Sequence, residues 1–309
     1  MHILLLTTCD LLSPRQDELA RLTRSLSFTA LASPHQITHI LLVQRAQAQD
    51  MAPMAAEALP FHRICLFAPT RLSLAVARNA MLGTAQAQGL LRSADWVAFP
   101  DDDAWYPPGL VDEVSTVFEQ HPGVSMVTCR YGAQPQNAVT GAGFLLENNA
   151  AALVRVLSSN TLFVRRSAVE AVGLYFDERL GLGATINGGE DLDYALRVMA
   201  QGGCVAFDPG RRVGHRDAVI WTRSTYFEGS LCALARAAAL SARLRPPYWR
   251  KLLVGSALVA RGELPLGRLW AALRQARSFG RQPRQVQAHG AALARVQRAS
   301  AATTTSTRA

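Results

Sequence analysis

Three consecutive carboxylates, Asp101, Asp102 and Asp103, are the residues of this sequence with the clearest potential for chemistry. They follow the apolar run at residues 96–99 after a single proline. Neighbouring anions repel one another, so three of them at a strand end need a compensating cation. Hard divalent cations such as Mg²⁺ bind through one or two carboxylates together with substrate phosphates. One interpretation is therefore a metal–phosphate site at the carboxyl edge of a parallel sheet. The other is a solvated acidic turn in which an Asp caps a helix.

A second acidic group, Glu190, Asp191 and Asp193, follows two glycines at 188 and 189. Apolar residues then recur with helical spacing over residues 192–199, which predicts an amphipathic helix. Acids in a first turn stabilise a helix through its macrodipole, and this is a sufficient structural explanation. The paired glycines favour a second explanation, because they let a ligand or another chain segment approach the backbone closely. A carboxylate beside such an opening is a candidate general base.

Two further residues become candidate site residues only because the acidic groups are present. His215 follows a predicted strand, and a lone histidine is more often structural than a ligand. Arg78 lies near the front of an alanine-rich helical pattern. Arginine binds phosphate oxygens bidentately, but a surface position on that helix is the plain alternative.

Strand and helix patterns that would position these residues alternate along the chain. Strands are predicted at residues 3–7, 39–43, 64–67, 96–99, 159–164 and 204–207, the last followed by a turn at 208–210. Helices are predicted at residues 17–31, 73–88, 110–118, 166–172 and 190–199. Strands that are apolar throughout are expected where a sheet is covered on both faces. The alternation predicts an α/β fold with a mostly parallel central sheet and helices on both faces.

Other parts of the chain depart from this alternation. Residues 133–152 are rich in small residues and are predicted to form a mobile loop, a kind of segment that often serves as a binding lid. A C-terminal helical region is predicted from the patterns at 226–244, 249–260 and 266–279, with prolines 246 and 247 breaking the first from the second. Residues 286–309 end in a Ser/Thr/Ala tail that is predicted to be disordered.

Charge is distributed unevenly. Residues 1–210 carry a net charge of −6, whereas residues 211–309 carry +15. Such asymmetry indicates an anionic partner for the C-terminal part, either a membrane surface or nucleic acid. Basic amphipathic helices with Trp and Leu can lie in a membrane interface, and packing on the first domain or on a second subunit is an equal alternative. We expect no nucleic-acid partner, because the tail lacks the interleaved aromatic residues of a stacking platform.

Composition favours a cytoplasmic protein. The five cysteines are widely spaced, without a C-x-x-C pair, as in proteins with reduced thiols. The N-terminal residues lack a basic segment typical of a signal peptide. Apolar stretches fall short of the roughly 18 residues that a membrane-spanning helix requires. We therefore expect a soluble or peripheral protein, located in the cytoplasm, with association at the inner face of the plasma membrane as the peripheral case.

The order of these pieces resembles that of the family-two glycosyltransferases with the GT-A fold. The resemblance spans roughly residues 3–217 and is carried by Leu72-Ser73, Ala77-Arg78-Asn79, Trp96-Val97-Ala98-Phe99-Pro100-Asp101-Asp102-Asp103 with Trp105-Tyr106-Pro107, Arg165-Arg166, Val172-Gly173-Leu174-Tyr175-Phe176-Asp177-Glu178, Gly189-Glu190-Asp191-Leu192-Asp193 with Arg197, Asp208-Pro209 and Val213-Gly214-His215. It implies a GT-A-like catalytic domain over residues 1–218, with a nucleotide-sugar half to about 104 and an acceptor half from about 105. A basic helical region at 219–285 and the tail at 286–309 would follow.

The resemblance also implies a reaction, in which a sugar moves from a nucleotide-diphosphate donor to a hydroxyl of a glycan or lipid-linked acceptor with inversion. The leaving diphosphate gains negative charge, which a bound Mn²⁺ or Mg²⁺ offsets as a Lewis acid. Asp101, Asp103 and His215 would hold this metal. Asp191 would be the general base, and Glu190 would orient the acceptor or Asp191.

Donor contacts are implied for the remaining site residues, which are Thr8, Ser73, Arg78, Asp101 and Asp102. One departure from the family pattern concerns the end of the second strand. Many relatives carry there an Asp that contacts the base, whereas this chain has Gln44, so Thr8 and Asp10 are the candidate substitutes. The alternative function is a non-catalytic member of the same fold that binds a nucleotide or a glycan.

Overall fold

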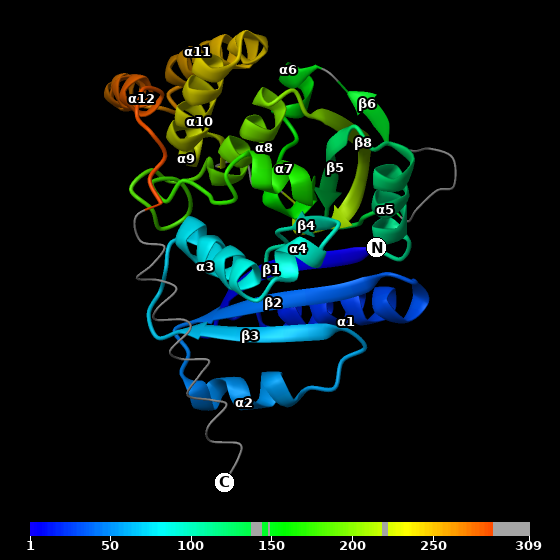
Figure 1. Ribbon diagram of the computed structural model, residues 1–309. Coiled ribbons are helices and arrows are strands. Elements are labelled where there is room, and N and C mark those ends of the chain that lie inside the picture. The colour runs from blue at the N-terminus through cyan, green and yellow to red at the C-terminus, as the bar shows by residue number, and fades with distance from the viewer. Residues whose placement is uncertain (137–143, 148, 218–221, 287–309) are drawn as a thin grey trace.

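The computed structural model describes residues 1–136, 144–147, 149–217 and 222–286 (Figure 1). The strands are β1 (His2–Asp10), β2 (Gln36–Gln44), β3 (His62–Ala68), β4 (Trp96–Ala98), β5 (Val124–Gly132), β6 (Leu145–Glu147), β7 (Leu162–Arg165) and β8 (Cys204–Gly214). The helices before residue 218 are α1 (Gln16–Ala32), α2 (Ala48–Ala56), α3 (Leu74–Ala87), α4 (Leu90–Ser93), α5 (Leu110–Gln120), α6 (Ala150–Leu153), the 3₁₀ turn η1 (Ser159–Thr161), α7 (Arg166–Ala171) and α8 (Glu190–Ala200). The later helices are α9 (Thr222–Thr225), α10 (Phe227–Leu240), the 3₁₀ turn η2 (Ala242–Leu244), α11 (Arg245–Ala260) and α12 (Leu266–Phe279).

All eight described strands form one sheet, in the order β3-β2-β1-β4-β7-β5-β8-β6. The pairs β1–β2, β1–β4, β2–β3 and β5–β8 are parallel. Strand β7 runs antiparallel between β4 and β5, and the short edge strand β6 runs antiparallel to β8. This arrangement confirms the predicted α/β fold with a mostly parallel sheet. The reversal at β7 brings the segment before it to the same sheet edge as the carboxyl end of β4.

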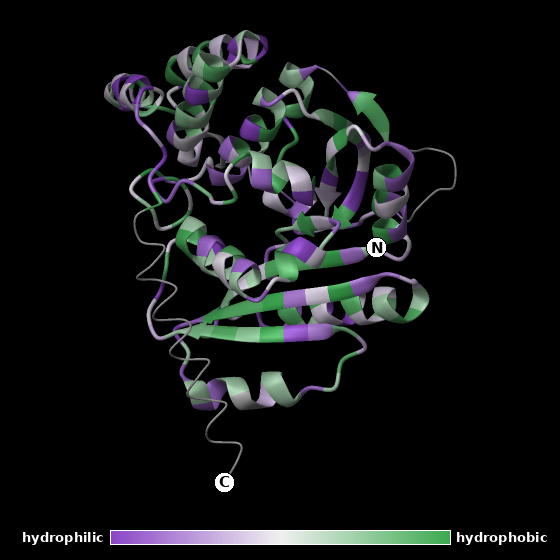
Figure 2. Ribbon diagram, viewed as in Figure 1, coloured by the Kyte–Doolittle hydropathy of each residue, from purple (hydrophilic) through white to green (hydrophobic). Residues whose placement is uncertain are grey.

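Helices cover both faces of the sheet because successive strand side chains point to opposite sides. In β1, Leu4 and Leu6 pack with α3, α4, α7 and α8. Ile3 and Leu5 pack on the other side with α1 and α5, and α2 joins this layer beside α1. Both layers are apolar in the middle, and Figure 2 shows β1 to β3 as largely hydrophobic ribbons. The strand ends at this rigid core are therefore fixed positions for polar side chains.

The C-terminal helices form a smaller core of their own beside the sheet (Figure 1). Helix α10 packs against α8 through Leu234 and Ala237 on one side, and against α11 and α12 through Phe227 and Leu231 on the other. The boundary predicted at residue 218 precedes α9, and α10 bridges it by this packing. Among the residues described here, no helix is both long enough and apolar enough to cross a membrane.

Several element predictions differ from the structure. The predicted turn at 208–210 lies inside β8, which continues to Gly214 with register irregularities against β5. Prolines 246 and 247 lie in the first turn of α11 instead of breaking the helix pattern, a place where a missing N–H costs nothing. The predicted loop at 133–152 contains β6 and the start of α6. Residues 137–143, residue 148 and residues 287–309 of the predicted loop and tail lie outside the described residues.

Candidate active site at the sheet edge

The first acidic group lies in the turn that follows β4, at the carboxyl edge of the sheet. Asp101 is held there by Asn160 of η1, in front of the neighbouring strand β7. The Asp101 N–H donates to Asn160 Oδ1 at 2.7 Å, and Asn160 Nδ2 donates to Asp101 Oδ2 at 3.0 Å. The sequence analysis did not single out Asn160, because its partner lies 59 residues earlier in the chain.

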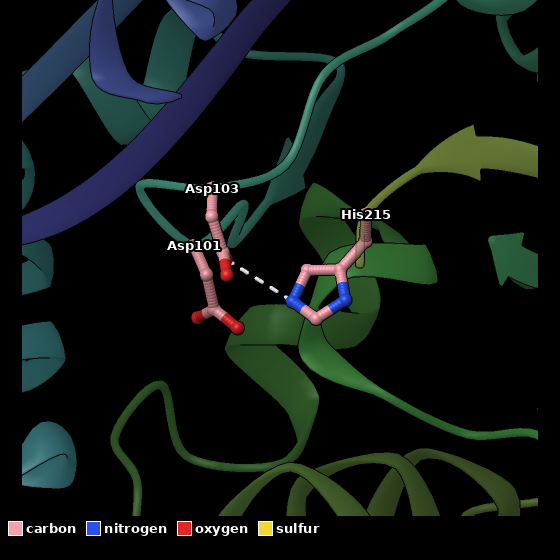
Figure 3. Close-up of side chains that lie close together, drawn as sticks. All are labelled: Asp101, Asp103 and His215. Atoms are coloured by element: carbon pink, nitrogen blue, oxygen red, sulfur yellow. Dashed lines mark ion pairs between the residues drawn. The ribbon is translucent and has the colours of Figure 1, made fainter. Parts of the chain in front are cut away.

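Asp101, Asp103 and His215 converge, as Figure 3 shows. One ligand atom from each lies within 4.8 Å of the others. His215 follows β8, and its Nε2 lies 3.1 Å from Asp103 Oδ1. Both carboxylate oxygens of Asp103 are buried without a hydrogen-bond partner. Two carboxylates and an imidazole are donors that suit Mn²⁺, and buried oxygens with free lone pairs fit a bound cation. These residues therefore fit the implied metal.

Three arginines that the sequence analysis passed over surround this group. Arg15 Nη1 lies 3.4 Å from Asp102 Oδ1 and 3.7 Å from Asp103 Oδ2. Arg216 Nε lies 3.0 Å from Asp103 Oδ2, and Arg21 donates to the Asp103 carbonyl at 3.3 Å. The position next to His215 was a signal for Arg216, whereas Arg15 and Arg21 carried none.

These cations shift the pKa values of the neighbouring carboxylates to different extents. Burial would raise the pKa of Asp103, but His215, Arg216 and Arg15 outweigh it, so the pKa lies below its ordinary value. Burial and the Asp103 charge raise the pKa of Asp102 to about 6, although Arg15 opposes them. Burial would lower the pKa of His215, but Asp103, the Arg216 carbonyl and Asp101 together outweigh it, so the pKa lies above its ordinary value. Asp103 is thus the carboxylate that stays ionised.

Arg78 connects the two acidic groups, which lie some ninety positions apart in the sequence. It comes from α3 and is 2% exposed. Its Nη2 lies 3.1 Å from Asp101 Oδ1, and its Nη1 lies 3.6 Å from Glu190 Oε1. The alternative interpretation, that Arg78 lies on the exposed surface of its helix, is therefore wrong. A single buried guanidinium holds the turn after β4 against the start of α8.

Glu190 and Asp191 form the first turn of α8, on the other side of Arg78. Glu190 is buried and its Oε2 has no hydrogen-bond partner. Burial and the Asp191 charge raise the pKa of Glu190 to about 7, with Arg78 opposing. Burial also raises the pKa of Asp191, again against Arg78, and the Asp101 charge adds to the rise. Asp191 is half-buried and accepts N–H bonds from Ser159 at 3.1 Å and Leu192 at 2.7 Å. Its carboxylate is oriented by backbone donors on both oxygens.

The glycines before α8 serve a close approach, as the sequence suggested. Gly188 and Gly189 adopt φ values of 75° and 86°. A Cβ on Gly189 would overlap the backbone of Gly229 in α10, and a Cβ on Gly229 would overlap the Gly188 carbonyl. Of the two possibilities left open by the sequence, the structure shows another chain segment at this place. Helix α10 thereby abuts the loop that leads into Glu190.

The two remaining donor-contact predictions lie at the ends of β1 and α3. Thr8 donates to the Leu42 carbonyl at 3.2 Å and accepts from Gln44 Nε2 at 2.8 Å. Ser73 is the N-cap of α3 and accepts the Val76 N–H at 3.4 Å. Within the described parts of the chain, neither hydroxyl bonds to the acidic groups. Asp10, the considered substitute, forms a bidentate pair with Arg45 at 2.8 and 2.7 Å.

Comparisons with known proteins agree with this architecture. The family model described as "Glycosyltransferase like family 2" matches residues 16–238. No curated protein sequence matches the chain.

Crystal structures of TarS from S. aureus are similar in fold. TarS 1–349 has 12% sequence identity and a TM-score of 0.59, with 91% of this chain and 81% of that chain covered. Its complex with UDP has 12% identity and a TM-score of 0.60, with 95% and 83% covered. Its complex with UDP-GlcNAc has 12% identity and a TM-score of 0.54, with 91% and 88% covered. Identity this low supports a shared fold.

Proposed function

Since this chain belongs to the Glycosyltransferase like family 2, whose model matches residues 16–238, we propose that it moves a sugar from a nucleotide-diphosphate donor to a hydroxyl of a glycan or lipid-linked acceptor. We further propose that the transfer is metal-dependent and inverts the configuration of the sugar. The observation that carries this proposal is the meeting of the two acidic groups across Arg78.

The proposed metal ligands are Asp101, Asp103 and His215. A bound Mn²⁺ or Mg²⁺ would supply Lewis-acid stabilisation of the leaving diphosphate. Asp103 is suited to this role because it is buried beside His215, the third proposed ligand, and because its pKa lies below the ordinary value. Asn160 fixes Asp101 through two hydrogen bonds, so this ligand is preorganised.

Asp191 is the proposed general base. Its carboxylate would accept the proton of the acceptor hydroxyl as the oxygen attacks the anomeric carbon. The raised pKa brings its basicity closer to neutral pH, where proton transfer is more efficient. Attack from the side of Asp191, opposite the diphosphate, would invert the anomeric configuration. Glu190, with its pKa near 7, would bind the acceptor hydroxyl and orient it toward Asp191.

Arg78 is proposed to bind the donor as well as to join the acids. Its Nη1 is buried without a hydrogen-bond partner, so it retains donor capacity for a phosphate or sugar oxygen. The TarS structures with UDP and UDP-GlcNAc support a nucleoside-diphosphate donor on this fold. Thr8, Ser73 and Asp102 remain proposed contacts for the rest of the donor. We also propose that the protein works in the cytoplasm, as a peripheral protein at the inner face of the membrane.

A paired binding and turnover experiment tests this proposal. Thermal stabilisation by nucleoside diphosphates with Mn²⁺ reports donor binding, because a ligand that binds only the folded state raises its stability. Release of nucleoside diphosphate from a panel of nucleotide sugars, with simple glycosides as acceptors, reports turnover. We expect D191N to lose turnover by about a hundredfold or more while the Mn²⁺-dependent thermal shift persists.

The matched control is D17N, which changes an exposed carboxylate on α1. It should leave both readouts unchanged. Full turnover in D191N would refute the role of Asp191. A wild-type protein that binds nucleotide but shows no turnover with any donor would favour the non-catalytic alternative.

A further inference from the structure

The last two helices expose large apolar side chains. Trp249 and Leu253 of α11 are 62% and 72% exposed, and Leu266 and Trp270 of α12 are each 57% exposed. Within each helix, the Trp and the Leu lie four residues apart, about one helical turn, and so share a face. Large apolar side chains of this size are normally withdrawn from water, so their grouping on two adjacent helices indicates a contact surface.

Both helices turn these residues away from the rest of the protein. Leu258 of α11 and Ala272 of α12 are buried in the core that the two helices share with α10. With about 3.6 residues per turn, positions 249 and 258 lie on opposite sides of α11. Positions 270 and 272 are likewise on nearly opposite sides of α12. The exposed residues therefore lie on the outer faces, with α10 behind both helices.

The same segment is strongly cationic. Between residues 242 and 281 the only acid is Glu263. The exposed basic residues of this segment are Arg243, Arg245, Arg250, Arg261, Arg268, Arg274, Arg277 and Arg281. Figure 2 shows hydrophilic and hydrophobic residues interspersed along α11 and α12. An arginine side chain can place its aliphatic part along an apolar layer and keep its guanidinium at a charged surface.

We propose that the outer faces of α11 and α12 dock the protein on an anionic phospholipid bilayer. Trp249 and Trp270 would enter the headgroup region, where amphipathic rings are favoured, and Leu253 and Leu266 would reach the acyl boundary. The surrounding arginines would pair with lipid phosphates. Nucleic acid matches the charge but offers no apolar layer for the exposed leucines. A protein partner would have to be acidic and apolar at once over both helices.

Docking in this way would orient the active site relative to the membrane. Helix α10 lies between the docking helices and α8, and its Arg236 is bound to Asp193 and Asp177 at 3.1 and 2.7 Å. The helix that carries Glu190 and Asp191 is therefore rigidly linked to the docking surface. This inference extends the membrane part of the proposed function by naming its surface, and only the delivery of a lipid-linked acceptor rests on the proposed chemistry.

Vesicle co-sedimentation of the full chain tests the docking surface. We compare vesicles of neutral phosphatidylcholine with vesicles that contain roughly 30% phosphatidylglycerol, at low and high salt. We expect binding to the anionic vesicles, at least about tenfold weaker binding to neutral ones, and release at high salt. The variants W249S/W270S and R274Q/R277Q should each weaken binding about tenfold or more. Thermal melting of each variant verifies that it is folded.

The matched control is F28S/L31S, which removes two exposed apolar side chains of α1 that are 54% and 78% exposed. It should bind vesicles like the wild type. Equal binding of wild type and both docking variants would overturn the proposal, and so would no binding of the wild type to anionic vesicles, whether or not it binds single-stranded DNA. D191N should bind vesicles normally, so a failure of docking and a failure of catalysis are told apart.

Discussion

Buried carboxylates occur in two regions of this protein, and arginine meets them differently in each. Asp177 and Asp193, between α8 and α10, are almost fully buried. Their oxygens accept from Arg179, Arg197 and Arg236 at 2.7 to 3.1 Å. At the active site, by contrast, Asp103 has His215 and Arg216 at 3.1 and 3.0 Å without a regular hydrogen bond, and one oxygen of Glu190 is buried without a hydrogen bond.

The difference indicates what each region is for. Burial would raise the pKa of Asp177, but Arg179 and Arg236 outweigh it and hold the pKa below its ordinary value. Glu190 has the Arg78 guanidinium at 3.6 Å, but burial and the Asp191 charge outweigh it and raise the pKa to about 7. A carboxylate whose lone pairs are all used stabilises the fold. A buried carboxylate with unused lone pairs is destabilising by itself, and its retention indicates a ligand that completes it.

Removing Arg236 should have the largest effect on stability. R236M takes one partner from each of two buried carboxylates, so we expect the free energy of unfolding to fall by about 3 kcal/mol or more. Urea denaturation measures this change. R243M, which removes an exposed arginine just after α10, is the control and should change it by less than about 0.5 kcal/mol. An equal effect of the two variants would contradict the structural role of the Asp177–Asp193 region.

Neutralising Asp103 should affect turnover much more than stability. D103N should lower turnover by about a hundredfold, or about 2.7 kcal/mol of transition-state stabilisation, and abolish the Mn²⁺-dependent thermal shift. Its free energy of unfolding without metal should fall, but by less than that of D193N, because the ionised Asp103 is stabilised by His215 and Arg216 and its pKa lies below the ordinary value. D193N provides the reverse comparison, with a clear loss of stability. Destabilisation of D103N as large as that of D193N would remove the distinction between the regions.

His39 tests whether an unsatisfied buried polar group must belong to the active site. It lies in β2 with both ring nitrogens unpartnered, and burial lowers its pKa from 6.5 to about 3. The folded state therefore favours the neutral ring, so its stability contribution is complete above the unfolded pKa and is lost as pH falls. Between pH 7.5 and pH 5 we expect the His39 contribution to fall by about 2 kcal/mol.

The comparison variant is H39L, measured by urea denaturation at both pH values. Its stability should depend less on pH than that of the wild type by this amount, because leucine has no proton to gain. Turnover at neutral pH should stay within about twofold of the wild type. Parallel pH profiles of the two proteins would show that His39 does not titrate with folding.

The smallest effect is expected for a partnered carboxylate in solvent. Glu170 pairs with Arg166 at 3.1 Å on the exposed surface of α7. E170Q should lower the free energy of unfolding by at most about 0.5 kcal/mol, because water competes for both charges. A loss as large as that of R236M would show that burial is not what separates the two kinds of pair.

Much of the fold was predictable because its signals are local. The apolar runs of β1 to β4 and the periodic patterns of α1, α3, α5 and α8 gave the right element types. Strand β5 was not predicted, because its sequence lies beside a turn-rich region. Its position in the sheet depends on pairing with β7 and β8. The turn residues at 208–210 were misassigned for a related reason, since pairing with β5 carries β8 through them.

Within the site, residue types were more predictable than partners. The acids and His215 stood out because carboxylate clusters are unusual beside an apolar strand. Arg15, Arg21 and Asn160 did not, because an arginine or asparagine has the same local signature whether it meets water or a buried acid. Arg216 could have been found by its position next to His215.

By itself the sequence determined the properties that depend on near neighbours: the alternation of strands and helices, the carboxylates at the end of β4 and the start of α8, and the positive charge of the C-terminal helices. Only the tertiary structure decided which charges meet. Arg78 joins Asp101 to Glu190, and Arg236 joins Asp177 to Asp193, across separations of 23 to 112 positions in the chain. Such pairs are energetically significant only where folding has removed water from both partners, and no local pattern records where that happens.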